Sequence, residues 1–307
     1  MLGSGPDDGD VLEMGPDKPR RGWAIGRRGR LALAGVCALI AVGGTLVGLR
    51  LNSSGPADPA LARLITEVTT VPVREASAVE PDGAGSYSGA LLPPDSPVDS
   101  ASSQVLLFGA PPPTRVNGRP LSSEGKPEVL YVATEFCPYC VAQSWPLIVA
   151  LSHFGEFSGL STSRSPTFDN VPPVDGWTFY GSSYTSRYLS FAPVETYSNV
   201  LVSPKADPAD KTSYRRLQRL TTAEQAVFSR FDGEGQTPFI DFGGTSTSIG
   251  SDFPPTVLTG LTWSVIAADL RRPASTPGAA ILFSAAVLTA ELCRLTGNRP
   301  AAACSKR

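Results

Sequence analysis

Two cysteines in the segment Glu135-Phe136-Cys137-Pro138-Tyr139-Cys140 have the spacing of a redox site. An apolar run, residues 129–133, leads into the segment, and apolar residues at helical spacing follow it. Cys-x-x-Cys at the start of a helix places two sulfurs within one helical turn, where they can close a disulfide. The first thiol then lies beside unpaired backbone N–H groups, which favour an anion together with the helix dipole. Pro138 suits the first helical position, because its missing N–H would be unpaired there anyway.

Two other interpretations of Cys137 and Cys140 remain open, half of a zinc site and a structural disulfide. A zinc site would need two more ligands, and Cys293, Cys304 and His153 give no familiar spacing for one. His153 is the only histidine, which argues against Ser-His-Asp and Cys-His catalysis. We therefore expect no metal and no cofactor, because a redox-active disulfide is its own redox centre.

Length and charge set wider bounds. The 307 residues suffice for one or two domains with a sizeable core. A net charge of −2, with 18% charged residues, gives no support for a nucleic-acid partner. The 30 glycines and 29 prolines predict much irregular chain.

The N-terminal region predicts a membrane anchor. Residues 1–30, expected to be disordered, pass from an acidic start into a basic run. Residues 31–49 carry no charge over 19 positions, which meets the criterion of about 18 apolar residues for a membrane helix. The basic residues lie before this run, so the positive-inside rule puts the N-terminus in the cytoplasm and the rest outside. A cleaved signal peptide is the rival interpretation, disfavoured by the long leading segment and the lack of an Ala-x-Ala site.

The expected protein is therefore a single-pass cell-membrane protein. Residues 31–50 form its transmembrane helix and residues 51–59 a linker, and residues 60–307 form an extracytoplasmic domain. Within this domain we expect a core at about 126–272 and a C-terminal helix and tail at 276–307. An oxidising compartment also favours disulfide chemistry at the Cys-x-x-Cys segment.

Apolar periodicity and turn residues predict the elements of the domain. The run at 105–108 fits either a strand or a long loop. In the first half we expect a helix at 61–68, a strand at 128–133, a helix from the second cysteine to about 154 that is kinked at Pro146, and a loop at 158–175. Strands at 177–180 and 188–194 follow, bridged by 181–186, and then a helix from Thr221 with a capping box to Glu224. The last expected elements are a hairpin at 238–249 turning at Gly243-Gly244, an amphipathic helix at 256–270 and a buried apolar helix at 279–295.

This order of elements resembles the thioredoxin fold. Cys137-Pro138-Tyr139-Cys140 is identical to the glutaredoxin signature and similar to the Cys-Pro-x-Cys of periplasmic disulfide oxidases. The resemblance implies an α/β thioredoxin-like fold with an insertion, because the interval from Cys140 to Pro238 is longer than in thioredoxin. It also implies a cis bond between Thr237 and Pro238 beside the disulfide. Cys137 would be the exposed attacking thiol and Cys140 the resolving thiol, with a substrate groove at Pro138, Tyr139, Thr237 and Pro238.

One position departs from the thioredoxin pattern. The buried acid of thioredoxins falls six residues before the first cysteine, where this chain has Tyr131. Glu135 or a water is the alternative for proton handling. The missing acid favours the rival function, a non-catalytic binding or scaffolding module with an inert disulfide. Catalysis would instead act on protein thiols or disulfides, with a redox partner protein.

Two phrases, at 160–165 and 179–195, resemble an uncharacterised membrane-anchored bacterial thioredoxin-like family, a domain of unknown function. The resemblance covers roughly residue 57 to the C-terminus. It supports the fold and adds little about activity. Two interpretations of its tyrosines stay open, a peptide-binding rim and aromatics that stabilise a hairpin: Tyr180, Tyr184 and Tyr188.

Cys293 and Cys304 are expected to form a structural disulfide that pins the C-terminal tail. Closing a loop of about a dozen residues stabilises a chain by about 3 kcal/mol in the chain-entropy model. The alternative is a second exchange pair that relays electrons to Cys137.

Overall fold

The computed structural model describes residues 58–72 and 112–304. The predicted cytoplasmic segment, the transmembrane helix and nearly all of the linker lie outside the described residues, as does the apolar run at 105–108.

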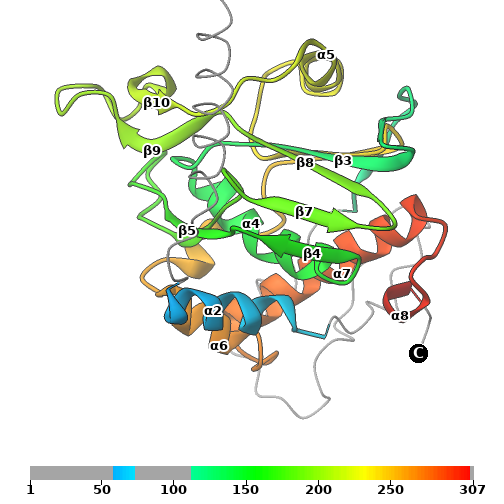
Figure 1. The fold of residues 1–307 in the computed structure, drawn as a ribbon. Coiled ribbons are helices and arrows are strands. Elements are labelled where there is room, and N and C mark those ends of the chain that lie inside the picture. Colours follow the sequence, from blue (N-terminus) through cyan, green and yellow to red (C-terminus); the bar gives the residue numbers. More distant parts are fainter. Residues whose placement is uncertain (1–57, 73–111, 305–307) are drawn as a thin grey trace, which may run out of the picture. The chain divides into compact units, whose positions relative to one another are not determined.

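A mixed β-sheet forms the centre of a mixed α/β fold (Figure 1). β3 lies between β11, which runs antiparallel to it, and β8, which runs parallel to it. β12 and β1 extend the sheet beyond β11, and β2 pairs with the start of β3. The strands are β1 (Thr114–Arg115), β2 (Ser122–Ser123), β3 (Lys126–Ala133), β8 (Ser190–Glu195), β11 (Phe239–Phe242) and β12 (Ser246–Ile249).

Helices cover both faces of this sheet. α5 lies on one face, and α4 and α7 pack against each other on the opposite face (Figure 1). The predicted capping box is confirmed, since the Thr221 and Glu224 side chains each accept a bond from the other residue's backbone N–H at the start of α5. The helices are α2 (Pro59–Thr69), α4 (Pro138–Leu151), α5 (Thr222–Phe231), α6 (Trp263–Asp269), α7 (Thr276–Leu295) and α8 (Ala301–Cys304).

The side-chain alternation of β3 separates two hydrophobic cores. Leu130 and Val132 belong to the smaller core beneath α5, where the Phe228 and Phe239 rings lie 5.2 Å apart. Tyr131 and its alternating neighbours belong to the larger core beneath α4 and α7. Both faces of β3 are therefore covered, which explains why its sequence is a continuous apolar run at 129–133.

The predicted loop at 158–175 is wrong in part, because this region contains a strand. β5 (Ser161–Arg164) pairs with β6 (Asp175–Thr178), and β4 (Gly155–Ser158) pairs with β7 (Ser183–Ser186). The predicted bridge at 181–186 is therefore largely a strand. β5 reads Ser-Thr-Ser-Arg, with one buried residue in four, so it gave no apolar signal.

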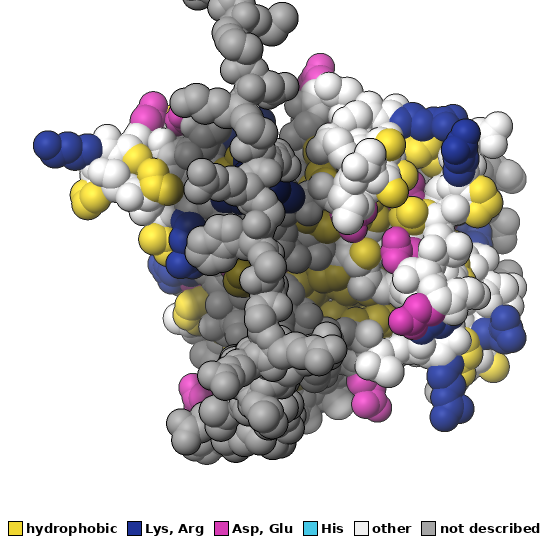
Figure 2. Space-filling model, turned by 45° about the horizontal axis from the view of Figure 1, so that its top comes forward, with side chains coloured by type: hydrophobic (Ala, Val, Ile, Leu, Met, Phe, Trp, Pro, Cys, Tyr) yellow, Lys and Arg dark blue, Asp and Glu magenta, His cyan; other side chains and the backbone are white. Residues whose placement is uncertain are grey.

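A two-stranded arm, residues 197–216, follows β8. It consists of β9 (Tyr197–Leu201), β10 (Tyr214–Arg216) and the connection between them, which includes the 3₁₀ turn Lys211–Ser213. Figure 1 shows it projecting at the upper left, and Figure 2 shows apolar, basic and acidic side chains together on that projection. The connection is folded on itself, because the Tyr214 hydroxyl donates to the Pro208 carbonyl at 3.0 Å.

The predicted helix at 256–270 is interrupted. A 3₁₀ turn spans Pro255–Leu258, and α6 begins only at Trp263. Gly260 lies between them with a φ of +77°, a conformation outside the helical region that glycine adopts without strain. The spacing of apolar residues continued through this break, so the pattern alone predicted one helix.

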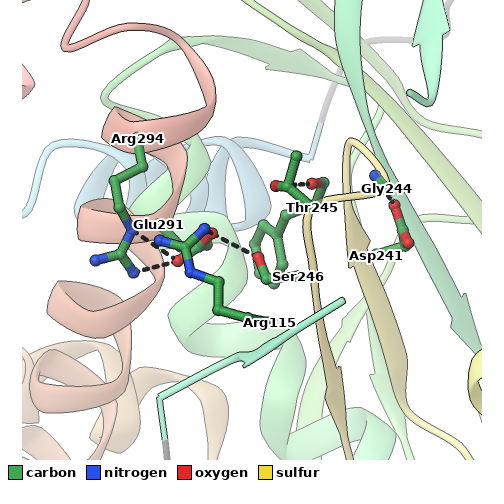
Figure 3. Close-up of polar contacts among 8 residues, drawn as sticks. Arg115, Asp241, Gly244, Thr245, Ser246, Glu291 and Arg294 are labelled. Atoms are coloured by element: carbon green, nitrogen blue, oxygen red, sulfur yellow. Dashed lines mark hydrogen bonds and ion pairs between the residues drawn. The ribbon is translucent and has the colours of Figure 1, made fainter. Parts of the chain in front are cut away.

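α7 is the apolar helix that the sequence placed in the core. It is the one helix among the described residues that is long and apolar enough to cross a membrane, and 67% of its most apolar window is buried inside the domain. Its charge Glu291 is 1% exposed and ion-paired with Arg294 and, at 3.6 Å, Arg115 (Figure 3). The Ser246 hydroxyl donates to Glu291 at 2.5 Å, which ties α7 to β12. A buried carboxylate with these partners fits a core helix.

The hairpin of β11 and β12 turns at Gly243-Gly244, as predicted. Asp241 of β11 accepts the backbone N–H of Gly244 at 2.6 Å, which closes the turn (Figure 3). Burial raises the pKa of Asp241 to about 6.

Gly176 allows β6 to approach α4 closely. A Cβ at this position would lie 2.5 Å from the Val141 carbonyl oxygen. This contact could be relieved only by moving the backbone of α4 or β6, which costs free energy. We expect Gly176→Ala to lower the free energy of unfolding by about 1–3 kcal/mol in urea denaturation. Gly233→Ala is the matched control, because a Cβ there meets nothing within 4 Å. Equal effects of the two substitutions would contradict the close approach.

Candidate functional site

The Cys-x-x-Cys segment lies where β3 passes into α4. Cys137 is the N-cap residue of α4, with extended backbone angles, and Pro138 occupies the first turn. The placement of both thiols in the first turn is as the sequence predicted. In this structure both are free thiols.

The prediction that Cys137 is exposed is wrong, because its side chain is only 6% exposed. The Cys137 sulfur lies 3.7 Å from the Thr237 carbonyl oxygen, so the loop before β11 passes beside the thiol. Cys140 is more deeply buried, at 3% exposure.

The two thiols differ electrostatically. The hydrogen bond from the Cys140 thiol is the main cause that lowers the pKa of Cys137, and the backbone N–H groups of Cys140 and Tyr139 lower it further. Burial raises the pKa of Cys140 well above its usual value, and the neighbouring Cys137 raises it again. Cys137 is therefore the thiol that ionises, which is the chemical requirement for a nucleophile.

The loop before β11 carries the other predicted groove residues. The Thr237–Pro238 peptide bond is cis, as the resemblance implied. The Pro238 carbonyl accepts the Gly250 N–H at 2.8 Å, which joins the residue before β11 to the residue after β12 at the open end of the hairpin. The structure thus brings Thr237 beside Cys137, while Pro138 and Tyr139 lie in the first turn of α4.

A buried polar network, which no sequence pattern predicted, fixes the loop after the hairpin to α4. Asp252 and Gln143 exchange two hydrogen bonds of 2.8 Å, one from the Gln143 amide and one from the Asp252 backbone. The Ser284 hydroxyl of α7 also donates to Asp252. Burial raises the pKa of Asp252 to about 6. Because Gln143 lies one turn beyond Cys140, this network positions α4 against α7.

Tyr131 does not act as an acid at the position where thioredoxins carry one. It is 1% exposed, and its hydroxyl donates to the Cys140 carbonyl at 3.0 Å. Burial raises the pKa of Tyr131 well above its usual value. Tyr131 therefore supports the first turn of α4 as a neutral donor.

Glu135 and a second carboxyl, Glu195, share one hydroxyl group. The Thr178 hydroxyl oxygen lies 2.8 Å from Glu135 Oε1 and 2.8 Å from Glu195 Oε2. A hydroxyl has one proton and cannot donate to two carboxylates at once, so one of the two acids must carry a proton and donate to Thr178. Glu195 is that acid, because it is 3% exposed and burial raises its pKa to about 7.

Glu195 was not among the predicted site residues. It ends β8 opposite Ala133, and its Oε1 accepts the Phe179 N–H at 2.6 Å. The one sequence signal that pointed to Glu195 as a site residue is its position at the end of an apolar run. Glu135, the predicted proton-handling residue, therefore belongs to a pair of carboxyls next to the Cys-x-x-Cys segment.

Aromatic side chains from the region after α4 cover Phe136, the residue before Cys137. The Phe136 ring stacks on Tyr214 at 4.4 Å and contacts Phe168 at 4.9 Å. Tyr197 completes the cluster at 6.3 Å. The arm is thus built directly onto the redox segment.

The three tyrosines at 180, 184 and 188 do not share one role. Tyr184 contacts Phe157 at 4.8 Å across the β4–β7 ribbon, and its hydroxyl donates to the Leu151 carbonyl at 2.8 Å. This favours the hairpin-stabilising interpretation for Tyr184. Tyr180 is 46% exposed, so its side chain is available at the surface.

The other candidate metal ligands have structural partners. Cys293 and Cys304 are bonded to each other, the pairing expected from the sequence. His153 is half-buried, and its Nε2 lies 3.0 Å from the Val71 carbonyl oxygen. Within residues 58–72 and 112–304, no three His, Cys, Asp or Glu side chains come together as a metal site.

A comparison with protein families gives one match. A family model described as a domain of unknown function, DUF929, matches residues 112–204. The matched range contains β3, α4, both cysteines of the redox segment and Glu195, and it ends within the arm. No curated protein and no solved structure matches the chain.

Protonation of Glu195 predicts a pH dependence of stability. An elevated pKa in the folded state means that the folded protein holds this proton more tightly, so its stabilisation is full below about pH 4.5 and is lost as the pH rises through about 7. The elevation corresponds to about 3 kcal/mol. We expect Glu195→Gln to remove a decline of this order between pH 4 and pH 8, measured by urea unfolding at constant ionic strength.

The control for this experiment is Glu156→Gln, because Glu156 is exposed in β4. That variant should keep the wild-type pH profile. A Glu195→Gln profile that is parallel to wild type would show that Glu195 is already ionised in the folded protein.

Proposed function

We propose that this chain is an extracytoplasmic thiol–disulfide oxidoreductase, anchored in the membrane through residues 31–49, that acts on protein thiols or disulfides. The observation that carries the proposal is the pair of free thiols at the start of α4 with opposite pKa directions, lowered for Cys137 and raised for Cys140. Such a pair divides the roles of exchange between one thiol that ionises readily and one that stays protonated.

A thioredoxin-like fold is part of the proposal. It is supported by the strand order β12-β11-β3-β8, by α4 and α7 on one face of the sheet, and by α5 on the other (Figure 1). The cis Thr237–Pro238 bond beside Cys137 also agrees with the resemblance. In this view the insertion consists of the β4–β7 pair, the β5–β6 pair and the arm, all of which lie between α4 and α5 in the chain.

Exchange follows from the two thiols. The Cys137 thiolate attacks one sulfur of a substrate disulfide, forms a mixed disulfide and releases the first substrate thiolate. Cys140 then loses its proton and attacks the Cys137 sulfur, which closes the Cys137–Cys140 disulfide and releases the second substrate thiolate. The proton from Cys140 is taken up by one of the two released thiolates, and two electrons pass to the substrate. The reverse steps oxidise a substrate dithiol, and a redox partner protein restores the pair.

A second candidate is a non-catalytic binding module. The low exposure of both thiols favours it, as does Tyr131 at the position where thioredoxins have an acid. The two candidates differ in whether Cys137 reacts with a protein disulfide.

Trapping experiments distinguish the two candidates. We expect Cys140→Ser to accumulate mixed disulfides with substrate proteins, since no thiol remains to resolve them. Cys137→Ser should trap few or none, because the pKa of Cys140 is raised and its sulfur is buried. The measurement is affinity purification of each variant followed by reducing and non-reducing gels. Equal trapping, or no trapping together with slow alkylation of Cys137, would favour the binding module.

The proposed location has its own test. The charge asymmetry around residues 31–49 predicts that a protease added to intact cells or spheroplasts digests the domain and spares the basic N-terminus. Immunoblotting with tags at each end measures this. Protection of the domain would contradict the extracytoplasmic location.

A further inference from the structure

The arm, residues 197–216, presents an apolar surface that the rest of the fold does not use. Val200 is 53% exposed and Val202 is 64% exposed. Val200 lies in β9, and Val202 directly follows the last residue of that strand, Leu201. β10 pairs with β9 and with no other strand among the described residues, which leaves a backbone edge at the arm.

The arm is also basic, although the whole chain has a net charge of −2. Its two acidic side chains are exposed and accept backbone N–H groups, since Asp210 caps the 3₁₀ turn and Asp207 accepts the Ala209 N–H at 2.9 Å, so four basic and two acidic residues give the arm a net charge of +2 (4 − 2). Its four basic residues are all exposed and form no ion pair within the described part of the chain: Lys205, Lys211, Arg215 and Arg216. The arm therefore offers positive charge beside exposed valines.

Rigid contacts join this surface to the redox segment. Tyr214 donates to Pro208 in the connection and stacks on Phe136 at 4.4 Å, so one side chain links the outer arm to the residue before Cys137. The Arg216 guanidinium lies 4.4 Å from the Tyr197 ring centroid. The Tyr197 carbonyl in turn accepts the Glu135 N–H at 2.9 Å.

We propose that the arm binds an extended polypeptide segment in which acidic side chains alternate with apolar ones, and that it thereby presents a cysteine of that polypeptide to Cys137. The basic residues pair with the acidic side chains, the valines contact the apolar ones, and the backbone edge pairs with the segment as an added strand. This inference names the substrate class and rests on the proposed function.

Peptide binding tests the arm without relying on exchange. The probe is a fluorescein-labelled 12-residue peptide of alternating Asp and Val, compared with the same peptide of Lys and Val, and binding is followed by fluorescence anisotropy. The protein is the full-length chain in non-ionic detergent, with Cys137→Ser and Cys140→Ser to prevent covalent capture. We expect the acidic peptide to bind at least tenfold more tightly than the basic one, with the difference reduced in high salt.

The arm variant reverses three charges, Lys205→Glu, Lys211→Glu and Arg215→Glu. The matched control reverses three exposed basic residues outside the arm: Arg119→Glu, Arg187→Glu and Arg271→Glu. We expect the arm variant to lose at least tenfold in affinity for the acidic peptide, and the control to stay within about twofold. Val200→Thr with Val202→Thr, which keeps the β-branched shape, should weaken binding several-fold. Equal losses in the arm variant and the control would overturn the inference.

A second measurement separates failure of the arm from failure of the proposed function. With its cysteines intact, the chain should react with the neutral disulfide 2,2′-dithiodipyridine at the same rate in wild type and arm variant, because this small molecule makes no use of the arm. Reaction without arm-dependent peptide binding overturns the inference alone. Arm-dependent binding without reaction supports the arm as a peptide-docking surface and overturns the proposed chemistry.

Discussion

The burial of α4 is the constraint on which the rest of the structure depends. Every residue of this helix except Tyr139 is buried, so each of its faces needs a partner. α7 covers one side, and β6 approaches another so closely that only a glycine fits at position 176. The Trp145 indole donates to the Asp175 carbonyl at 2.9 Å, which satisfies the largest polar side chain of the helix. The start of α4 is thereby fixed, and with it the two sulfurs.

Fixing the helix inside the core also determines its chemistry. The Cys140 thiol, at the end of the first turn, is removed from water, and burial keeps it protonated. The Cys137 thiol, at the N-cap, is nearly as buried, but backbone N–H groups and the neighbouring Cys140 thiol stabilise its anion. The difference between Cys137 and Cys140 therefore comes from hydrogen bonding at the helix end more than from exposure. Exposure, expected for Cys137, hardly differs between the two thiols, at 6% for Cys137 and 3% for Cys140.

Two buried acids, Glu195 and Asp252, bond residues near this region, and a third, Asp241, lies at the β11–β12 turn. Glu195, Asp241 and Asp252 all have raised pKa values, and each has a different partner. Asp252 holds α4 and α7 together through Gln143 and Ser284, whereas Glu195 and Glu135 both contact the Thr178 hydroxyl. Asp252 and Glu195 bond residues of other elements, whereas Asp241 bonds Gly244, three residues away in the same hairpin. The region between α4 and α5 supplies Thr178, Glu195 and the aromatic cluster over Phe136, and so it completes the surroundings of the redox segment.

The sequence by itself determined the elements whose signals are local. The strand before Cys137, the capping box of α5, the glycine turn of the β11–β12 hairpin and the Cys293–Cys304 pairing each follow from neighbouring residues, and the structure contains them. Sequence also placed Cys137 at a helix start, because proline and the apolar periodicity mark that boundary.

Only the tertiary structure decided what depends on distant segments. β5 is a strand because β6 pairs with it, and its own residues carry no apolar pattern. The helix expected at 256–270 breaks because Gly260 adopts a positive φ, which apolar spacing does not reveal. The burial of Cys137 depends on the Thr237 loop, 100 residues away in the chain, and the raised pKa of Glu195 depends on its burial in the fold. Burial, and the pKa shifts that burial causes, are properties of groups brought together by folding, so no local pattern could specify them.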